Sequence, residues 1–180
     1  MMHEDVCEIL ITREQLHSRI KEMGKQISKD YAGCNLLMIS VLKGSIVFMA
    51  DLMREITIPA RIDFMAVSSY GSGVKTTGAV KIIKDLDLDV SGYDLLIVED
   101  ILDSGITLSY LTQILERRAP RSIRLATLLD KPERRQIQVT PDYLGFTIPD
   151  HFVIGYGLDY DEKYRGLPYV GVLKPEIYSV

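Results

Sequence analysis

The stretch from Leu95 to Tyr110, LLIVEDILDSGITLSY, decides the fold. Its first four residues form an apolar run that is too short for an independent helix, and two carboxylates follow at once. This pattern is typical of a buried strand of a parallel sheet that ends in acidic residues. Beyond a small-residue turn, leucine and isoleucine recur at helical spacing, so we expect a helix to begin near Thr107. The unit is therefore a strand, an acidic strand end, a short loop and a helix N-terminus.

The loop between this strand and this helix combines an anion site with an acidic neighbour. Gly105 permits a sharp turn and a close approach of the backbone to a ligand. Ser104 and Thr107 supply hydroxyl groups, and the first N–H groups of a helix favour phosphate. Glu99 and Asp100 would repel a bare phosphate, whereas carboxylate and hydroxyl oxygens suit Mg²⁺. A sugar phosphate that binds together with Mg²⁺ would suit both the anion site and the two acidic residues.

The run from Val98 to Thr107, VEDILDSGIT, resembles the phosphoribosyl-pyrophosphate signature of type I phosphoribosyltransferases, in the form found in hypoxanthine-guanine phosphoribosyltransferases. The alternative interpretation is an ordinary acidic turn with a helix-capping threonine. The resemblance implies that Glu99 and Asp100 hold the ribose hydroxyls and Mg²⁺. It also implies a cradle for the 5′-phosphate, formed by Asp103, Ser104, Gly105, Ile106 and Thr107.

Asp103 is the candidate for general acid/base catalysis, which the resemblance would place at N7 of the purine. Its alternative role is to cap the loop, because aspartate commonly accepts hydrogen bonds from nearby backbone N–H groups. We expect an oxocarbenium-like transition state at C1′ of the ribose, so the protein's contribution should be electrostatic and positional.

A second strand–loop–helix unit precedes the first. The apolar run over residues 35–41 predicts another buried strand, and Lys43 and Gly44 lie in the turn that follows it. Free N–H groups beside a cation form a candidate pyrophosphate site, although Lys-Gly turns are common in any fold. The sequence LKGS also resembles the pyrophosphate-binding loop of the family, and Arg165 resembles its arginine on the pyrophosphate side.

The segment over residues 69–78 is rich in glycine, serine and threonine and lacks periodicity. It separates strands expected over residues 60–68 and 79–84. The segment is either a hairpin loop or linker, or a lid, as long loops in compact domains often are. Ser69 and Tyr70 resemble the pair that begins the family's mobile loop, whose closure excludes water from the reacting centre.

The resemblance also implies a purine site. Lys131 follows a strand expected over residues 121–129 and would donate to the oxygen at C6 of the purine, although it could be a plain surface lysine. Phe152 would stack on the purine and the backbone of Val153 would read the purine edge; otherwise both are strand core. Asp159 resembles a carboxylate that serves a second Mg²⁺, directly or through water.

Composition sets the outer limits of these interpretations. The chain has 180 residues, of which 47% are hydrophobic and 26% charged, as expected of one globular domain. We find no membrane-spanning apolar run and no signal-peptide pattern. Cys7 and Cys34 lack metal-ligand spacing, and we expect reduced packing residues in a cytoplasmic protein. The net charge of −4 argues against nucleic-acid binding.

The alternation of strands and helices predicts an α/β fold, with an open, mostly parallel twisted sheet and helices on both faces. Residues 12–30 should form one helix, in which Thr12 and Gln15 match a capping box. The resemblance covers roughly residues 35–173. It implies one phosphoribosyltransferase domain over residues 1–180, with a small hood from the C-terminal segment and possibly from the N-terminus. It further implies a homodimer or homotetramer.

The activity implied by the resemblance is purine salvage. The enzyme would transfer 5-phosphoribosyl from phosphoribosyl pyrophosphate to N9 of hypoxanthine or guanine, giving IMP or GMP and pyrophosphate. Two alternatives stay open, namely a phosphoribosyltransferase for another base, such as xanthine or adenine, and a regulatory RNA-binding protein of the same fold. Lys131 and Phe152 favour a 6-oxopurine, and the acidic balance disfavours RNA.

Overall fold

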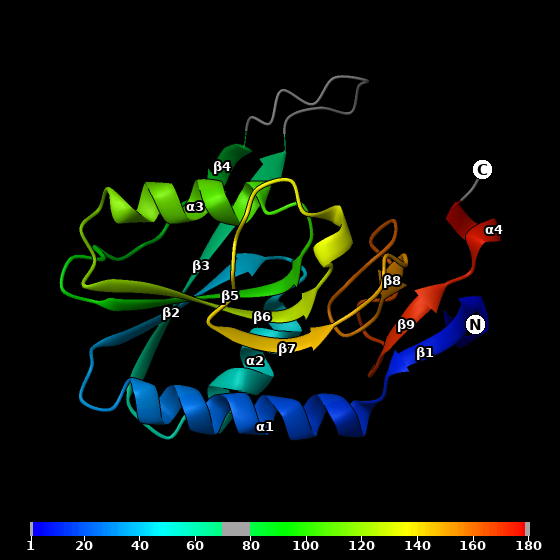
Figure 1. The fold of residues 1–180 in the computed structure, drawn as a ribbon, viewed down its shortest axis with the longest axis horizontal. Helices are drawn as coiled ribbons and strands as arrows, with labels where there is room; N and C mark the ends of the chain where they lie inside the picture. The colour runs from blue at the N-terminus through cyan, green and yellow to red at the C-terminus, as the bar shows by residue number, and fades with distance from the viewer. Residues whose placement is uncertain (1, 70–79, 179–180) are drawn as a thin grey trace.

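The computed structural model describes residues 2–69 and 80–178 of the chain (Figure 1). In chain order its elements are η1 (Met2–Asp5), β1 (Val6–Ile11), α1 (Arg13–Asp30), β2 (Leu36–Leu42), α2 (Ile46–Glu55), β3 (Ala60–Ser69), β4 (Val80–Lys84), β5 (Asp94–Leu102), α3 (Ile106–Glu116), β6 (Ser122–Asp130), η2 (Pro132–Arg134), β7 (Tyr143–Thr147), β8 (Val153–Ile154), β9 (Val170–Leu173) and α4 (Pro175–Tyr178).

The main sheet has six strands in the order β4-β3-β2-β5-β6-β7. All neighbouring pairs are parallel except β3 and β4, so β4 is an antiparallel edge strand. The predicted open, mostly parallel sheet is therefore confirmed. Because parallel strands end at the same edge, the loops after β2, β5 and β6 lie beside one another there.

Helices cover both faces of this sheet, as predicted. Along β5, Leu96 and Val98 pack into the core beneath α1 and α2, whereas Leu95 and Ile97 pack into the core beneath α3. Figure 1 shows α3 on one side of the sheet and α1 with α2 on the other. The apolar run of β5 is continuous because each of its side chains meets a covered face.

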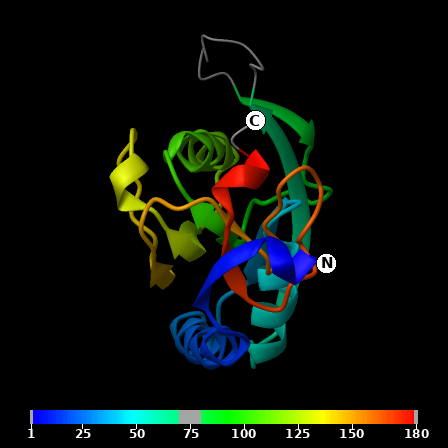
Figure 2. The same ribbon diagram turned by 90° about the vertical axis from the view of Figure 1, so that its right-hand side faces the viewer.

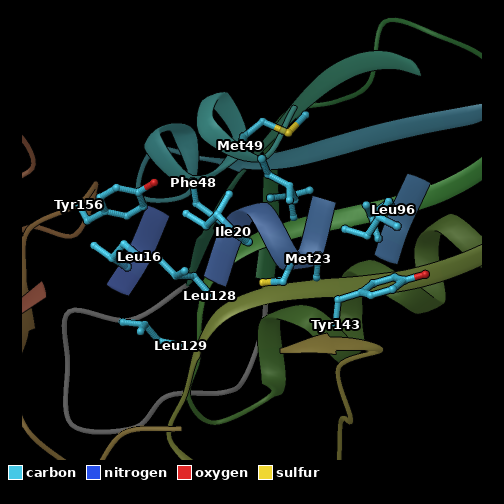
Figure 3. Packing of buried hydrophobic residues seen from close by; sticks show 14 of the residues in the cluster. Leu16, Ile20, Met23, Phe48, Met49, Leu96, Leu128, Leu129, Tyr143 and Tyr156 are labelled. Atoms are coloured by element: carbon cyan, nitrogen blue, oxygen red, sulfur yellow. The ribbon is translucent and has the colours of Figure 1, made fainter. Parts of the chain in front are cut away.

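The first helix begins where its capping pattern predicted. The N–H of Gln15 donates to Oγ1 of Thr12 at 3.3 Å, and the N–H of Thr12 donates to Oε1 of Gln15 at 2.8 Å. The two bonds satisfy backbone donors that the helix itself leaves free. Leu16, Ile20 and Met23 then form a buried stripe that packs toward α2 and the sheet (Figure 3).

A second, antiparallel sheet of three strands has the order β1-β9-β8 and joins both ends of the chain. It lies beyond the arrowheads of β5, β6 and β7 in Figure 1, and Figure 2 looks onto it. The sequence pattern did not indicate β1. This sheet therefore sits over the edge of the main sheet at which the strands end.

The expectation that both cysteines are packing residues is wrong. Cys7 and Cys34 are reduced and exposed. Cys7 lies on β1, which pairs on one side with β9, and Cys34 lies in the turn after α1. Among the residues placed by the structure, no helix is long and apolar enough to cross a membrane.

Candidate active site

The loops that follow β5 and β6 start side by side. Leu102 pairs with Asp130 in the parallel ladder, and the N–H of Lys131 donates to the carbonyl of Leu102 at 3.0 Å. Asp103 and Lys131 therefore leave the sheet as neighbours, because the two strands are parallel.

Two acids occupy the carboxyl end of β5. Oε2 of Glu99 is buried and has no hydrogen-bond partner among the residues that the structure describes. Burial, and then the adjacent charge of Asp100, raises the pKa of Glu99 well above its ordinary value. Asp100 is 9% exposed, and burial raises its pKa to about 6, although a hydrogen bond from the N–H of Ile101 opposes the shift. A cation or hydroxyl ligand would satisfy both carboxylates.

The three acids implied as metal ligands do not form a complete metal site by themselves. Within the described parts of the chain, no three side chains of His, Cys, Asp or Glu are grouped so that they could hold a metal ion. Mg²⁺, however, usually takes only one or two carboxylates from the protein and completes its shell with water and substrate phosphates. The unpaired Oε2 of Glu99 and the buried carboxylate of Asp100 fit that kind of site.

The turn into α3 has the geometry of an anion cradle. Gly105 has a φ of +82°, and a Cβ there would overlap the carbonyl oxygen of Ile137, so the position requires glycine. The N-cap residue of α3 is Gly105, which has no side chain to cap the helix, and the first turn contains no acidic residue. The N–H of Ile106 donates to Oγ of Ser104 at 3.3 Å. The N-terminus of an eleven-residue helix thus remains available to a phosphate group.

The segment after β6 holds this turn in place, which the sequence did not reveal. The N–H groups of Gln136 and Ile137 both donate to the carbonyl of Ser104, at 2.9 and 3.0 Å. Nε of Arg135 donates to the carbonyl of Asp103 at 3.0 Å, while its Nη2 forms an ion pair with Asp130. The shape of the cradle therefore depends on a segment about thirty residues further along the chain.

Asp103 stands in a row of alternating charges. Nε of Arg134 lies 3.3 Å from Oδ1 of Asp103, without hydrogen-bond geometry. Nη1 of Arg134 lies 3.7 Å from Oδ1 of Asp150, and that oxygen is 3.6 Å from Nζ of Lys131. Asp103, the catalytic candidate, is thus connected to the candidate purine residue Lys131 through two side chains that sequence reasoning missed.

Lys131 is not a surface lysine and Phe152 is not a strand-core residue, so neither fits the alternative to a purine-binding role. Lys131 is 5% exposed, and its Nζ donates to the carbonyl of His151, so it is not a surface lysine. Phe152 is 38% exposed, so it is not strand core, and its ring stacks on Tyr178 with centroids 4.9 Å apart. Val153 is buried in β8 next to it.

The loop after β2 lies against the acidic end of β5. The Leu42–Lys43 peptide bond is cis. A Cβ at Gly44 would overlap the carboxylate of Asp100, and a Cβ at Gly157 would overlap the carbonyl of Gly44. The backbone of Gly44 is therefore enclosed between Asp100 and Gly157. A larger residue at position 44 or 157 would not fit.

Further charged candidate residues lie on the segment after β8. Nη1 of Arg165 donates to the carbonyl of Gly157 at 2.8 Å, and its Nη2 lies 2.9 Å from Oδ1 of Asp159. Glu162, which sequence reasoning missed, accepts from Nζ of Lys43 at 3.0 Å and lies 3.4 Å from Nη2 of Arg165. The structure thus brings Lys43, Asp159 and Arg165 together around one further carboxylate.

Ser69 ends β3, and Tyr70 lies outside the described residues together with the rest of the predicted loop. A cavity of about 780 Å³ opens elsewhere, between α1, α2 and residues 165–168. Arg165 is the single candidate residue among its lining side chains. Apart from Arg165, the candidate residues therefore lie outside the lining of this cavity.

Comparison with known proteins gives one consistent result. The family model for the phosphoribosyl transferase domain matches residues 12–161. The chain is 51% identical over 178 residues to the bifunctional protein TilS/HprT of Listeria monocytogenes, but spans only 28% of that protein's length. It is 51% identical to a hypoxanthine-guanine phosphoribosyltransferase of Bacillus subtilis, with 99% of both chains covered. A solved hypoxanthine phosphoribosyltransferase of Staphylococcus aureus matches with a TM-score of 0.96 at 50% identity, covering 99% of this chain and 97% of that one.

Proposed function

Because the chain belongs to the phosphoribosyltransferase family, we propose that it acts as a hypoxanthine-guanine phosphoribosyltransferase in purine salvage. In the proposed reaction, N9 of hypoxanthine or guanine forms a bond to C1′ of phosphoribosyl pyrophosphate. The bond from C1′ to the pyrophosphate oxygen breaks, and the purine proton leaves to a base. The products are IMP or GMP and pyrophosphate.

The observation that carries this proposal is the contact between the loop after β2 and the acidic end of β5. The carboxylate of Asp100 lies against the backbone of Gly44. Gly44 follows β2, which is the strand next to β5, and β5 leads into the N-terminus of α3. A ligand with a phosphate at one end, hydroxyls in the middle and a diphosphate at the other end matches this order. Phosphoribosyl pyrophosphate has that arrangement.

The ribose and its 5′-phosphate would lie along β5 and the turn into α3. Ser104, Gly105, Ile106 and Thr107 would cradle the 5′-phosphate with hydroxyls and backbone N–H groups. Glu99 and Asp100 would accept from the ribose hydroxyls, which offers the buried Oε2 of Glu99 a partner.

The pyrophosphate would lie at the loop after β2. Lys43 and Arg165 supply positive charge there, and Gly44 allows the loop to pack closely against Asp100. Glu99, Asp100 and Asp159 are the residues that would hold Mg²⁺ with the help of substrate oxygens. When bound, Mg²⁺ would offset the charge that grows on the departing pyrophosphate.

The purine would lie between the segments after β6 and before β8. Nζ of Lys131 would donate to the oxygen at C6, the ring of Phe152 would stack on the base, and the backbone of Val153 would read its edge. Asp103 would exchange a proton with N7 of the purine. A donor at C6 favours 6-oxopurines over adenine, whose amino group is itself a donor.

The same proposal gives roles to the remaining features. The sheet formed by β1, β9 and β8 would serve as the hood of a single phosphoribosyltransferase domain over residues 1–180. Ser69 and Tyr70 would begin a loop that closes over the substrates. From the family resemblance we further propose a homodimer or homotetramer, and from the two reduced cysteines a cytoplasmic location.

A base panel tests the function directly. The purified protein is incubated with phosphoribosyl pyrophosphate, MgCl₂ and one base at a time, namely hypoxanthine, guanine, xanthine or adenine, and nucleotides are separated by chromatography. We expect IMP and GMP with stoichiometric pyrophosphate, and little AMP. Preferential formation of AMP or XMP would assign another base, and absence of every nucleotide would contradict the proposal.

A further inference from the structure

The part of the candidate site that would bind pyrophosphate contains a carboxylate to which the proposed function gives no role. Glu162 lies between Lys43 and Arg165, the two cations that would bind pyrophosphate. Its Oε2 accepts from Nζ of Lys43 at 3.0 Å, and its Oε1 lies 3.4 Å from Nη2 of Arg165. One carboxylate thus uses both of its oxygens on the donors that two phosphate oxygens would need.

The charges of this group are balanced without any ligand. Arg165 is also paired with Asp159 at 2.9 Å, so two cations face two carboxylates. An incoming pyrophosphate would therefore meet a neutralised group rather than two free cations.

The backbone at Glu162 gives a second, independent reason to assign this side chain a role. Asp161 and Glu162 have φ values of 52° and 58°, and they form the two-residue turn between Tyr160 and Lys163. Such turns favour glycine and asparagine, because other side chains are strained in the left-handed region. A glutamate is therefore a poor choice for the turn itself, and strain of this kind is common where a side chain serves the site.

We propose that Glu162 occupies the pyrophosphate position in the substrate-free enzyme and competes with the pyrophosphate group for Lys43 and Arg165. This inference rests on the proposed function, because it concerns the same site. When phosphoribosyl pyrophosphate binds, the Glu162 carboxylate leaves both cations; when pyrophosphate departs, the carboxylate returns. The residue thus weakens binding of substrate and product alike, and it affects the pyrophosphate end without touching the purine.

Two variants of Glu162 separate charge from backbone shape. Glu162→Gln removes the charge and keeps the size, whereas Glu162→Gly removes the side chain and relieves the left-handed strain. In both variants we expect the KM for phosphoribosyl pyrophosphate and the inhibition constant of pyrophosphate to fall. Exposed ion pairs are individually weak, so the expected change is roughly two- to tenfold. The KM for hypoxanthine should not change. A general structural effect would instead alter the KM values of both substrates.

The matched control is Glu22→Gln. Glu22 pairs with Arg19 at 2.9 Å on the surface of α1, with a side-chain exposure of 63% compared with 65% for Glu162. This substitution should leave all three constants unchanged. The difference between wild type and Glu162→Gln should also shrink as ionic strength rises from 20 to 500 mM, because exposed charges are then screened.

The outcomes distinguish this inference from the proposed function. If the wild type forms IMP but Glu162→Gln raises the KM for phosphoribosyl pyrophosphate, or leaves it unchanged, Glu162 does not compete with pyrophosphate and the inference is wrong. If the wild type forms no nucleotide, the proposed function fails. In that case, calorimetric titration of wild type and variant with pyrophosphate and MgCl₂ still tests the competition, and equal affinities would overturn it.

Discussion

Asp103 is surrounded by groups that come from other parts of the chain. Its backbone carbonyl accepts from Arg135 and its carboxylate lies 3.3 Å from Nε of Arg134, yet Oδ1 is buried and has no hydrogen bond within the described structure. A buried acceptor without a donor is unusual in a purely structural aspartate. The geometry therefore favours the catalytic interpretation over loop capping.

Asp103→Asn should lower kcat far more than it changes substrate binding. The amide keeps the shape of the side chain but cannot exchange a proton with the purine, and general acid/base catalysis typically contributes about 10²- to 10⁴-fold. Steady-state kinetics with hypoxanthine and phosphoribosyl pyrophosphate would separate kcat from the two KM values. An unchanged kcat would remove Asp103 from the chemical step.

Asp100→Asn should stabilise the protein in EDTA at pH 8 while it impairs the activity measured with Mg²⁺. Burial raises the pKa of Asp100 from 3.8 to about 6, so the folded state binds the proton more tightly than the unfolded state. The associated stability is present below about pH 4 and is lost as the pH rises through 6. Asparagine does not ionise and therefore keeps this stability, which is worth on the order of 3 kcal/mol at pH 8.

Urea unfolding of both proteins between pH 4 and pH 8 would measure this difference. The free energy of unfolding of Asp100→Asn should exceed that of the wild type at pH 8, and the gap should narrow toward pH 4. A gap that widens at low pH would mean that Asp100 is stabilised as an anion in the folded state.

Sequence reasoning found the functional candidates that follow strand ends, because strand ends are visible in the chain. It missed Arg134, Arg135 and Glu162, each of which has a partner far away in the chain, at separations of 31, 32 and 119 residues. The sequence around a charged residue in a polar segment does not indicate which distant residue it will contact. Only the position of Glu162 in a two-residue turn is unusual, and the turn was not apparent from sequence.

At the scale of elements, the β5–turn–α3 unit was predictable almost in full. Its apolar run, acidic end, glycine turn and helical spacing are local features, and the structure places β5 over Asp94–Leu102 and α3 over Ile106–Glu116. β1 was missed because its sequence, VCEILI, lacks clear alternation and its partner β9 lies at the other end of the chain.

Gly105→Ala should be much more harmful than Gly92→Ala. The two glycines have φ values of +82° and +79°, so both substitutions carry the same left-handed strain of about 1 kcal/mol. A Cβ at Gly92 meets nothing within 4 Å, whereas a Cβ at Gly105 overlaps the carbonyl oxygen of Ile137. Only Gly105→Ala should therefore displace the turn and raise the KM for phosphoribosyl pyrophosphate.

Thermal unfolding and steady-state kinetics of both variants would check this pair. Equal losses of stability and equal KM values would show that the turn tolerates displacement, and would weaken the case for a rigid phosphate cradle before α3.

At the scale of the whole molecule, the candidate active site depends on how the small sheet meets the main sheet and its helices. Tyr156, which follows β8, is buried among residues of α1 and α2, and its hydroxyl donates to Asp51 of α2 (Figure 3). Figure 2 shows the small sheet in front of the main one. This contact ties the segment that carries Asp159 and Arg165 to the helix that follows the Lys43 loop.

Tyr156→Phe should lower the free energy of unfolding by about 1 kcal/mol, the usual value of one lost hydrogen bond. Tyr110→Phe is the control, because the Tyr110 hydroxyl forms no hydrogen bond within the described residues. Urea unfolding would compare the two. Equal stabilities of Tyr156→Phe and the control would mean that the hydroxyl contributes nothing to the junction.

The mostly parallel sheet and its two covered faces were predictable from the sequence, because buried parallel strands appear as continuous apolar runs. The order of the strands was not predicted. The way in which the two chain ends pair was not predictable either, because nothing local in β1 or β9 specifies a partner more than 150 residues away.

The central claim is that the acidic end of β5 and the turn into α3 together bind a magnesium-loaded phosphoribosyl pyrophosphate. Isothermal titration calorimetry of the wild type with this compound, with and without MgCl₂, tests it most directly. We predict saturable binding, one molecule per chain, that requires Mg²⁺ and is lost in a Glu99→Gln/Asp100→Asn double variant. Absence of binding by the folded wild type in the presence of MgCl₂ would contradict the account.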